Sequence, residues 1–67
     1  MTIQEATKQS MEMGTYIRRK NVLWQKIKLK PTNTPDGCIA FKQGNPPRKG
    51  WQPKAEDLMA EDWIVVD

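Results

Sequence analysis

The fold is organised around one stretch near the end of the chain, Gly50-Trp51-Gln52-Pro53-Lys54-Ala55-Glu56-Asp57-Leu58-Met59-Ala60-Glu61-Asp62-Trp63. Pro53 suits the cap or first turn of a short helix, where its missing N–H removes no hydrogen bond. Glu56 and Asp57 then favour the positive N-terminal end of that helix. Leu58 and Met59 give the helix a small apolar face. The stretch therefore predicts a turn followed by a short helix.

A second helix is predicted at the start of the chain. Thr2 and Glu5 have the spacing of a capping box, so the helix should begin at Ile3. Gly14 is placed to end it in a left-handed conformation. Helical periodicity predicts an inward stripe made of Ile3, Ala6, Ser10 and Met13, with Met11 beside it.

Strands are predicted where β-branched and aromatic residues concentrate, at residues 16–19, 24–30, 38–41 and 63–66. In the second of these, Ile27 and Leu29 share the core face, and Pro31 ends the strand. Asp36 and Gly37 are best explained as turn chemistry. The chain thus predicts a single α+β domain over residues 1–67. It has a small antiparallel sheet of about four strands, an N-terminal helix packed on the sheet, and a short second helix before the last strand.

The size of the chain predicts self-association. A chain of 67 residues buries only about 60% of the surface that its unfolded form exposes. The single cysteine, Cys38, allows no internal disulfide, and with no His a zinc site made by the protein alone is implausible. Pairing the apolar faces of small sheets is the simplest source of further stability, so we expect an oligomer.

Charge is divided unevenly along the chain. Residues 1–53 carry ten Lys or Arg against three acids, whereas residues 54–67 carry one Lys against five acids. The basic part should attract phosphates, and the acidic part opposes a long polyanion laid across the whole surface. A compact anionic ligand is therefore favoured over nucleic acid. With no apolar run long enough to cross a bilayer and no signal-peptide pattern, we expect a cytosolic protein.

Two segments supply candidate ligand contacts. Arg18 and Arg19 point to opposite faces of a strand, so only one of them can face a given site. If the strand from Trp24 is regular, Trp24 lies on the same face as the lysines that follow it. It would then offer a flat surface to a purine, with Lys28 near the phosphates. The alternative is that Trp24 precedes the regular strand and packs inward.

The remaining polar groups point to binding rather than catalysis. The hydroxyl of Thr34, in the loop after Pro31, is placed to meet a ribose or a base edge. Cys38 is an unlikely nucleophile because no His is available to activate it. The carboxylates concentrate where they serve as helix-start charges. We therefore expect a non-enzymatic protein that needs no cofactor and no metal.

Several separated motifs carry a family resemblance. They are Gly50-Trp51-x-Pro53 with Asp57 and Ala60-x-Asp62-Trp63, the run Ile17-Arg18-Arg19-Lys20 with Trp24 soon after, and the run from Lys28 to Gly37. Together they resemble the second type of Thoeris anti-defense protein, a family of small phage and prophage proteins. The likeness covers nearly the whole chain.

The resemblance implies a sponge that binds the cyclic ADP-ribose-type signal of a bacterial TIR enzyme (glycocyclic ADP-ribose) and keeps it from the Thoeris effector. Some members are similar in also holding cyclic dinucleotides. It further implies a homotetramer, built as a dimer of dimers, in the host cytosol. The ligand-binding residues that it implies are Arg18, Trp24, Trp51, Pro53 and Asp57. Two alternatives remain open, namely a single-stranded nucleic-acid-binding module and a small protein-interaction adaptor.

Overall fold

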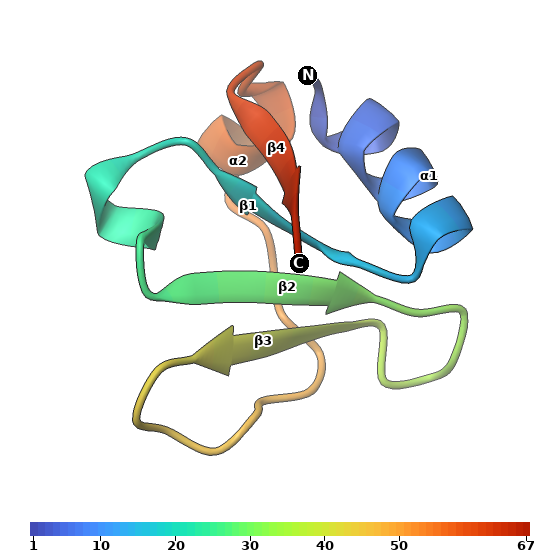
Figure 1. The fold of residues 1–67 in the computed structure, drawn as a ribbon, viewed down its shortest axis with the longest axis vertical. Helices are drawn as coiled ribbons and strands as arrows, with labels where there is room; N and C mark the ends of the chain where they lie inside the picture. The colour runs from blue at the N-terminus through green and yellow to red at the C-terminus, as the bar shows by residue number, and fades with distance from the viewer.

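The computed structural model describes residues 1–67 as an α+β fold with one four-stranded antiparallel sheet (Figure 1). The strand order is β3-β2-β1-β4. The elements in chain order are α1 (Ile3–Met13), β1 (Tyr16–Arg19), the 3₁₀ turn η1 (Val22–Trp24), β2 (Ile27–Pro31), β3 (Cys38–Lys42), α2 (Ala55–Met59) and β4 (Trp63–Val66). The predicted helix at the start, the short helix before the last strand and the four strands are confirmed.

Helix α1 has the predicted ends. The Thr2 side chain accepts a hydrogen bond from the Glu5 N–H, the Glu5 carboxylate accepts one from the Thr2 N–H, and Gly14 ends the helix at φ 68°. Only Ala6 and Ser10 of its inward stripe are fully buried. The expected contribution of Met13 and Met11 is wrong, because these side chains are 61% and 42% exposed.

The register of the sheet fixes its core face. Ile17 pairs with Leu29 on one side and with Val65 on the other, and Leu29 pairs with Ala40. Directly paired residues lie on the same face of a sheet. Ile17 and Leu29 are fully buried there under α1, together with Ala6 and Trp63. Ile27 lies on the same face but is only partly buried, outside this core cluster.

The three tryptophans form a triangle beside this core. Trp24, Trp51 and Trp63 pack edge to face, with ring centroids 5.4 to 6.2 Å apart. The expectation that a regular strand carries Trp24 onto the lysine face is wrong. Trp24 ends η1, three residues before β2 begins, and packs inward against the core. Asn21 caps η1 by accepting the Leu23 N–H, and this turn redirects the chain before the strand.

Helix α2 begins at Ala55, with Lys54 as its cap, so Pro53 precedes the cap. Its expected apolar face is wrong, because Leu58 and Met59 are 55% and 74% exposed while Asp57 is buried. Hydrogen bonds explain this orientation. The Asp57 carboxylate accepts the Lys54 N–H and pairs with Arg19, and the Asp57 carbonyl accepts the Trp63 indole N–H at 2.8 Å.

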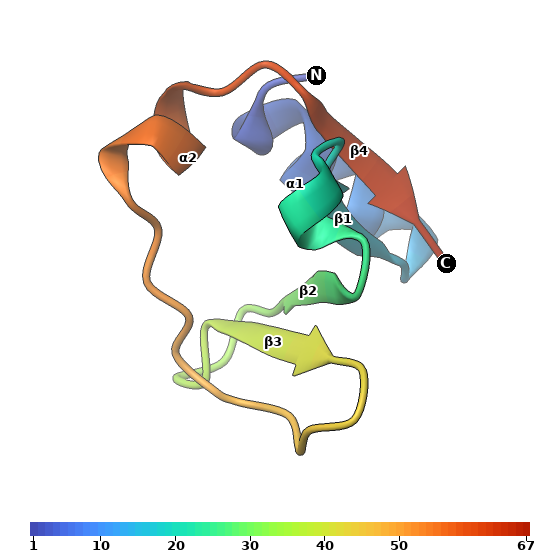
Figure 2. The same ribbon diagram turned by 90° about the vertical axis from the view of Figure 1, so that its left-hand side faces the viewer.

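The segment after β3 rises along one side of the molecule to α2 and then crosses to β4 (Figure 2). It is fastened to the edge of β3 by hydrogen bonds between Ala40 and Arg48 in both directions and by the Trp51 N–H, which donates to the Cys38 carbonyl. The segment therefore covers the β3 edge and places Trp51 beside the sheet.

Candidate functional site: a basic hollow on the uncovered side of the sheet

The second face of the sheet carries neither helix. Because side chains alternate along a strand, this face receives the residues that flank the core positions. We call it the open face, made of Tyr16, Arg18, Lys28, Lys30, Ile39, Phe41, Ile64 and Val66. All eight side chains are half-buried, and none is acidic.

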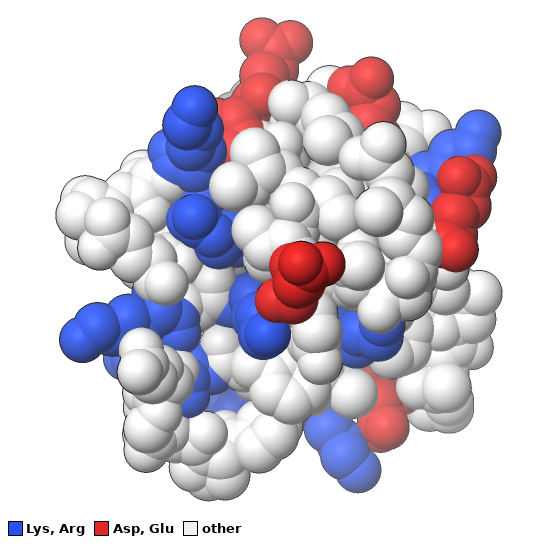
Figure 3. Space-filling view, in the orientation of Figure 1, with Lys and Arg blue, Asp and Glu red and all other residues white.

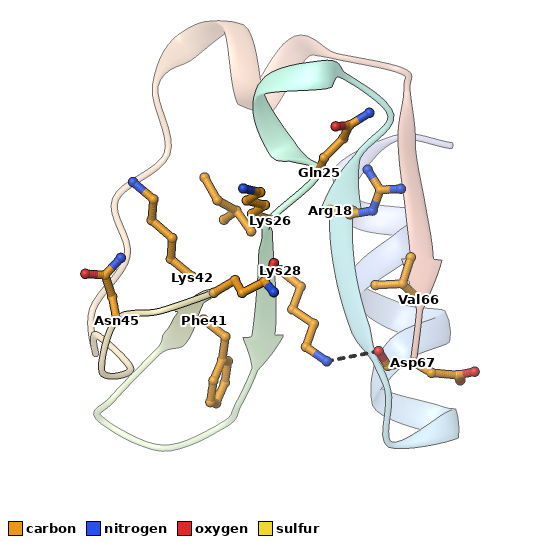
Figure 4. A pocket seen from close by; sticks show the side chains of 11 residues that line it. Arg18, Gln25, Lys26, Lys28, Phe41, Lys42, Asn45, Val66 and Asp67 are labelled. Atoms are coloured by element: carbon orange, nitrogen blue, oxygen red, sulfur yellow. Dashed lines mark hydrogen bonds between the residues drawn. The ribbon is translucent and has the colours of Figure 1, made fainter.

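A hollow of about 470 Å³ opens along one end of this face (Figure 4). This volume lies in the usual range of small-ligand sites. We call it the basic hollow, lined by Arg18, Gln25, Lys26, Ile27, Lys28, Phe41, Lys42, Gln43, Asn45, Val66 and Asp67. All four strands or their ends contribute to it. Lys and Arg side chains gather in the left half of the same face (Figure 3).

The basic hollow holds four cations against the single carboxylate of Asp67. Lys28 crosses the face, with its Nζ 3.0 Å from the Asp67 carbonyl oxygen and 4.0 Å from the centre of the Tyr16 ring. Arg18 donates only to the Arg19 carbonyl, at 3.1 Å. The side-chain ammonium groups of Lys26 and Lys42 make no hydrogen bond or ion pair within the protein. Most of the positive charge here is therefore available to an anion.

Three amide side chains, Gln25, Gln43 and Asn45, lie among these cations. None of them makes a hydrogen bond within the protein. Each amide offers both donors and an acceptor, whereas a lysine offers donors only. The hollow can therefore match an anion together with a polar group such as a ribose hydroxyl or a base edge.

A smaller hollow of about 310 Å³ lies on the other side of Lys42. We call it the Trp51 hollow, lined by Ile27, Ala40, Lys42, Asn45, Pro46, Arg48 and Trp51. Ile27, Lys42 and Asn45 line both hollows, so the two adjoin. The half-buried Trp51 ring gives this second hollow an aromatic wall beside two cations.

The two arginines of β1 separate as expected. Arg18 lines the basic hollow on the open face. Arg19 lies on the other face, where its Nε donates to Asp62 at 2.9 Å and its Nη1 donates to Asp57 at 3.2 Å. The hydrogen bond to Asp62, followed by that to Asp57, raises the pKa of Arg19 above its usual range. Arg19 thus joins β1 to α2 and to the start of β4.

The structure brings together only some of the seven predicted ligand residues. Arg18 and Lys28 line the basic hollow, and Trp51 lines the adjoining one. Thr34 and Pro53 are exposed and line neither hollow.

Two further residues predicted to contact the ligand make their contacts within the fold instead. Trp24 packs inward within the tryptophan triangle, and Asp57 is held by Arg19 and the Lys54 N–H. Thr34 likewise takes part in its own loop, where its carbonyl accepts the Gly37 N–H and its hydroxyl lies 2.9 Å from that of Thr32. This arrangement agrees with the turn chemistry expected for Asp36 and Gly37.

Sequence reasoning missed Lys42, Gln43 and Asn45 because they follow the predicted end of the third strand. Strand β3 extends to Lys42, which pairs with Ile27. That pairing places Lys42, and the turn that follows it, beside the start of β2. The signal that could have located them is the turn at Gly44, with φ 85°, after which the chain returns along the edge of β3.

Cys38 is half-buried, and burial raises the pKa of its thiol. A raised pKa leaves less of the reactive thiolate at neutral pH.

No helix of the structure has both the length and the apolar character needed to cross a membrane.

Comparison with known proteins identifies the family of the chain. No curated protein and no solved structure is similar enough to count as a match. The family of Thoeris anti-defense 2-like domains matches residues 1–66 of the 67-residue chain. On this nearly complete match, the chain belongs to the Thoeris anti-defense 2-like family, which supports an anti-defense role against Thoeris.

Proposed function

We propose that the protein is a sponge that binds a cyclic ADP-ribose-type signal and keeps it from the Thoeris effector. The observation that supports this most is the basic hollow, where four cations converge against one carboxylate. A pyrophosphate carries charge of the opposite sign in a compact form. The anti-defense role of the family is compatible with capture of the signal that activates the effector.

The chemistry of the two hollows fits the parts of such a ligand. The Arg18 guanidinium is suited to grip phosphate oxygens with two parallel hydrogen bonds, and the lysines supply further charge. The free amides of Gln25 and Asn45 suit ribose hydroxyls or a base edge. The Trp51 ring in the adjoining hollow offers a surface on which adenine can stack.

Capture, rather than catalysis, is the activity proposed. The residues that line the basic hollow are cations, amides and apolar side chains, with Asp67 as the one carboxylate. Sequestration needs slow release, which is achieved by burying most of the ligand surface.

We propose that a homotetramer in the host cytoplasm encloses the ligand between subunits. We also propose that cyclic dinucleotides are a second class of ligand.

Calorimetry with a panel of cyclic ADP-ribose isomers and cyclic dinucleotides tests this proposal. We expect tight binding of at least one member, with fewer than one ligand per chain. Lys42→Ala should weaken binding at least about tenfold, because it removes a charge-assisted contact from both hollows. Lys49→Ala is the matched control. Lys49 is exposed, lies outside both hollows and pairs only with Asp36 at 3.8 Å, so its loss should leave the affinity unchanged.

Absence of heat with every member of the panel would refute the sponge. The same protein should then be titrated with single-stranded oligonucleotides over a range of salt concentrations. An affinity that falls steeply with salt would indicate a nucleic-acid module, since many phosphate contacts release many counterions. Lack of binding to both kinds of ligand would leave a protein-interaction adaptor.

A further inference from the structure

Tyr16 lies on the open face but does not line the basic hollow. It begins β1, an inner strand of the sheet, and its side chain is half-buried. The Tyr16 ring packs edge to face with Phe41, with 5.5 Å between the ring centres and 89° between the ring planes. This contact restricts rotation of the Tyr16 ring and gives it a fixed orientation on the open face.

The Tyr16 ring is in contact with the ammonium group of Lys28. Lys28 Nζ lies 4.0 Å from the ring centre, which is within the range of a cation–π contact. The same group donates to the Asp67 carbonyl oxygen at 3.0 Å (Figure 4). An ammonium group has three donors, so these two contacts leave at least one N–H for a ligand in the basic hollow.

Lys28 differs in this respect from the other lysines of the basic hollow. Lys26 and Lys42 are exposed, and their ammonium groups make no hydrogen bond or ion pair within the protein. A free lysine side chain loses rotamer entropy when a ligand fixes its ammonium group. Lys28 is half-buried and already held at its tip, so part of this entropy is lost on folding rather than on binding.

Lys30 lies near the same ring but outside both hollows. Its Nζ is 5.3 Å from the centre of the Tyr16 ring and donates to the Thr15 carbonyl oxygen at 3.3 Å. Any effect of the Tyr16 ring on the basic hollow is therefore transmitted through Lys28.

We propose that Tyr16 is a positioning residue for ligand binding, because its ring holds the Lys28 ammonium group ready to meet an anion in the basic hollow. This inference rests on the proposed function and adds to its site a residue that lines neither hollow. The aromatic face is the part of Tyr16 that acts. Phenylalanine should therefore replace it, whereas leucine, which is apolar but has no aromatic face, should not.

Calorimetry of the full chain with inorganic pyrophosphate tests the inference through a double-mutant cycle. We expect Tyr16→Leu to weaken pyrophosphate binding about threefold or more, and Tyr16→Phe to bind as the original chain does. In the Lys28→Met background, Tyr16→Leu should have no further effect, because the ammonium group that the ring holds is absent. Lys30→Met is the matched control, since Tyr16→Leu should keep its full effect in that background.

Three results of this cycle would overturn the inference. A purely structural role of Tyr16 would make Tyr16→Leu weaken binding equally with and without Lys28. Loss of the aromatic face would not be the cause if Tyr16→Phe bound as weakly as Tyr16→Leu. An original chain that binds no pyrophosphate would leave Lys28 without an anion to meet.

NMR of the original chain provides a second measurement, which remains available if Tyr16→Leu does not fold. Protons next to the ammonium group of a lysine held over an aromatic ring resonate upfield of those of a free lysine. We expect the Cε protons of Lys28 to lie upfield of those of Lys26 in the protein without ligand. Equal shifts for the two lysines would contradict the proposed role of Tyr16.

Calorimetry with the panel of cyclic nucleotides separates this inference from the proposed function. Nucleotide binding by the original chain, without coupling between Tyr16 and Lys28, would leave the sponge intact and refute the role of Tyr16. Coupling measured with pyrophosphate, with no cyclic nucleotide bound, would support the role of Tyr16 in anion binding and refute the sponge.

Discussion

Asp57 shows how a single polar residue positions an element in this small fold. Its carboxylate accepts the Lys54 N–H at 2.9 Å and pairs with Arg19 at 3.2 Å, while its carbonyl accepts the Trp63 indole N–H. The side chains of Arg19 and Asp57 are only 15% and 10% exposed. Asp57 therefore connects α2 to β1 and to the central tryptophan of the core.

We expect Asp57→Ala to destabilise the protein by about 1.5–3 kcal/mol, because it removes hydrogen bonds to a charged group and leaves Arg19 with one partner fewer. Urea unfolding followed by tryptophan fluorescence measures this change. Asp62→Ala is the matched control, since Asp62 also pairs with Arg19 but is 36% exposed and should contribute less. A larger loss of stability for Asp62→Ala than for Asp57→Ala would contradict this ranking.

The position of Trp24 could not be predicted from the alternation of residues along the strand. Alternation from Ile27 and Leu29 correctly gives the face of the lysines in β2, because it depends only on the pleat of the strand. Whether that alternation extends back to Trp24 depends on where the regular strand begins. The structure places η1 before β2, and the indole packs against the other tryptophans instead. Burial of the large indole ring of Trp24 therefore outweighed continuation of the regular strand back to this residue.

At the scale of elements, the capping box of α1 makes the stability of the fold depend on pH. The Thr2 backbone N–H donates to the Glu5 carboxylate, and this hydrogen bond is the main cause of the lowered pKa of Glu5. A carboxyl whose pKa is lower in the folded chain stabilises it above the unfolded pKa, about 4.3. That contribution disappears as the pH falls through the folded pKa.

We therefore expect Glu5→Gln to be less stable than the original chain at neutral pH, with the difference shrinking on acidification below about pH 4. Helix content followed by circular dichroism during urea unfolding, at a series of pH values, measures this. Glu12→Gln is the control, because Glu12 is exposed, lies near the C-terminal end of α1 and accepts no hydrogen bond from a cap. A difference between Glu5→Gln and the original chain that grows on acidification would contradict the linkage.

The elements themselves could be predicted because their signals are local. Caps, β-branched runs and turn residues fix α1, β1 and β4 from a few neighbouring positions. The orientation of α2 could not be predicted in this way. Leu58 and Met59 have the composition of a core stripe, yet contacts with Trp63 and with Arg19, which is 38 residues away in sequence, turn Asp57 inward instead. A helix of five residues offers too little apolar area to outweigh those bonds.

At the scale of the whole molecule, the site depends on how distant segments come together. The charge division along the sequence correctly indicated a basic region, and Lys28 was assigned to a ligand site from strand alternation and Arg18 from the family resemblance. The assembly of that region with Lys42 and Asn45 follows from the pairing of β2 with β3 and from the turn beyond. This long-range register brings the cations into one hollow, and it cannot be read from spacing alone.

The small core is the reason to expect that the stability of the protein depends on the proposed association. Only four hydrophobic residues are fully buried in a single copy, while the open face leaves apolar side chains of β3 and β4 half-exposed. A chain stabilised by pairing unfolds at a temperature that rises with its concentration, because unfolding is then coupled to dissociation.

We expect a hundredfold increase in chain concentration to raise the unfolding midpoint by about 5 °C or more. Differential scanning fluorimetry over that range measures the shift. Phe41→Glu, on the open face, should unfold at a lower midpoint that does not depend on concentration, whereas Met59→Glu should keep the dependence, since Met59 lies on α2, away from the open face. A midpoint of the original chain that stays constant over the whole range would show that one copy is stable without a partner. The four buried apolar residues and the Asp57 network would then suffice for the fold.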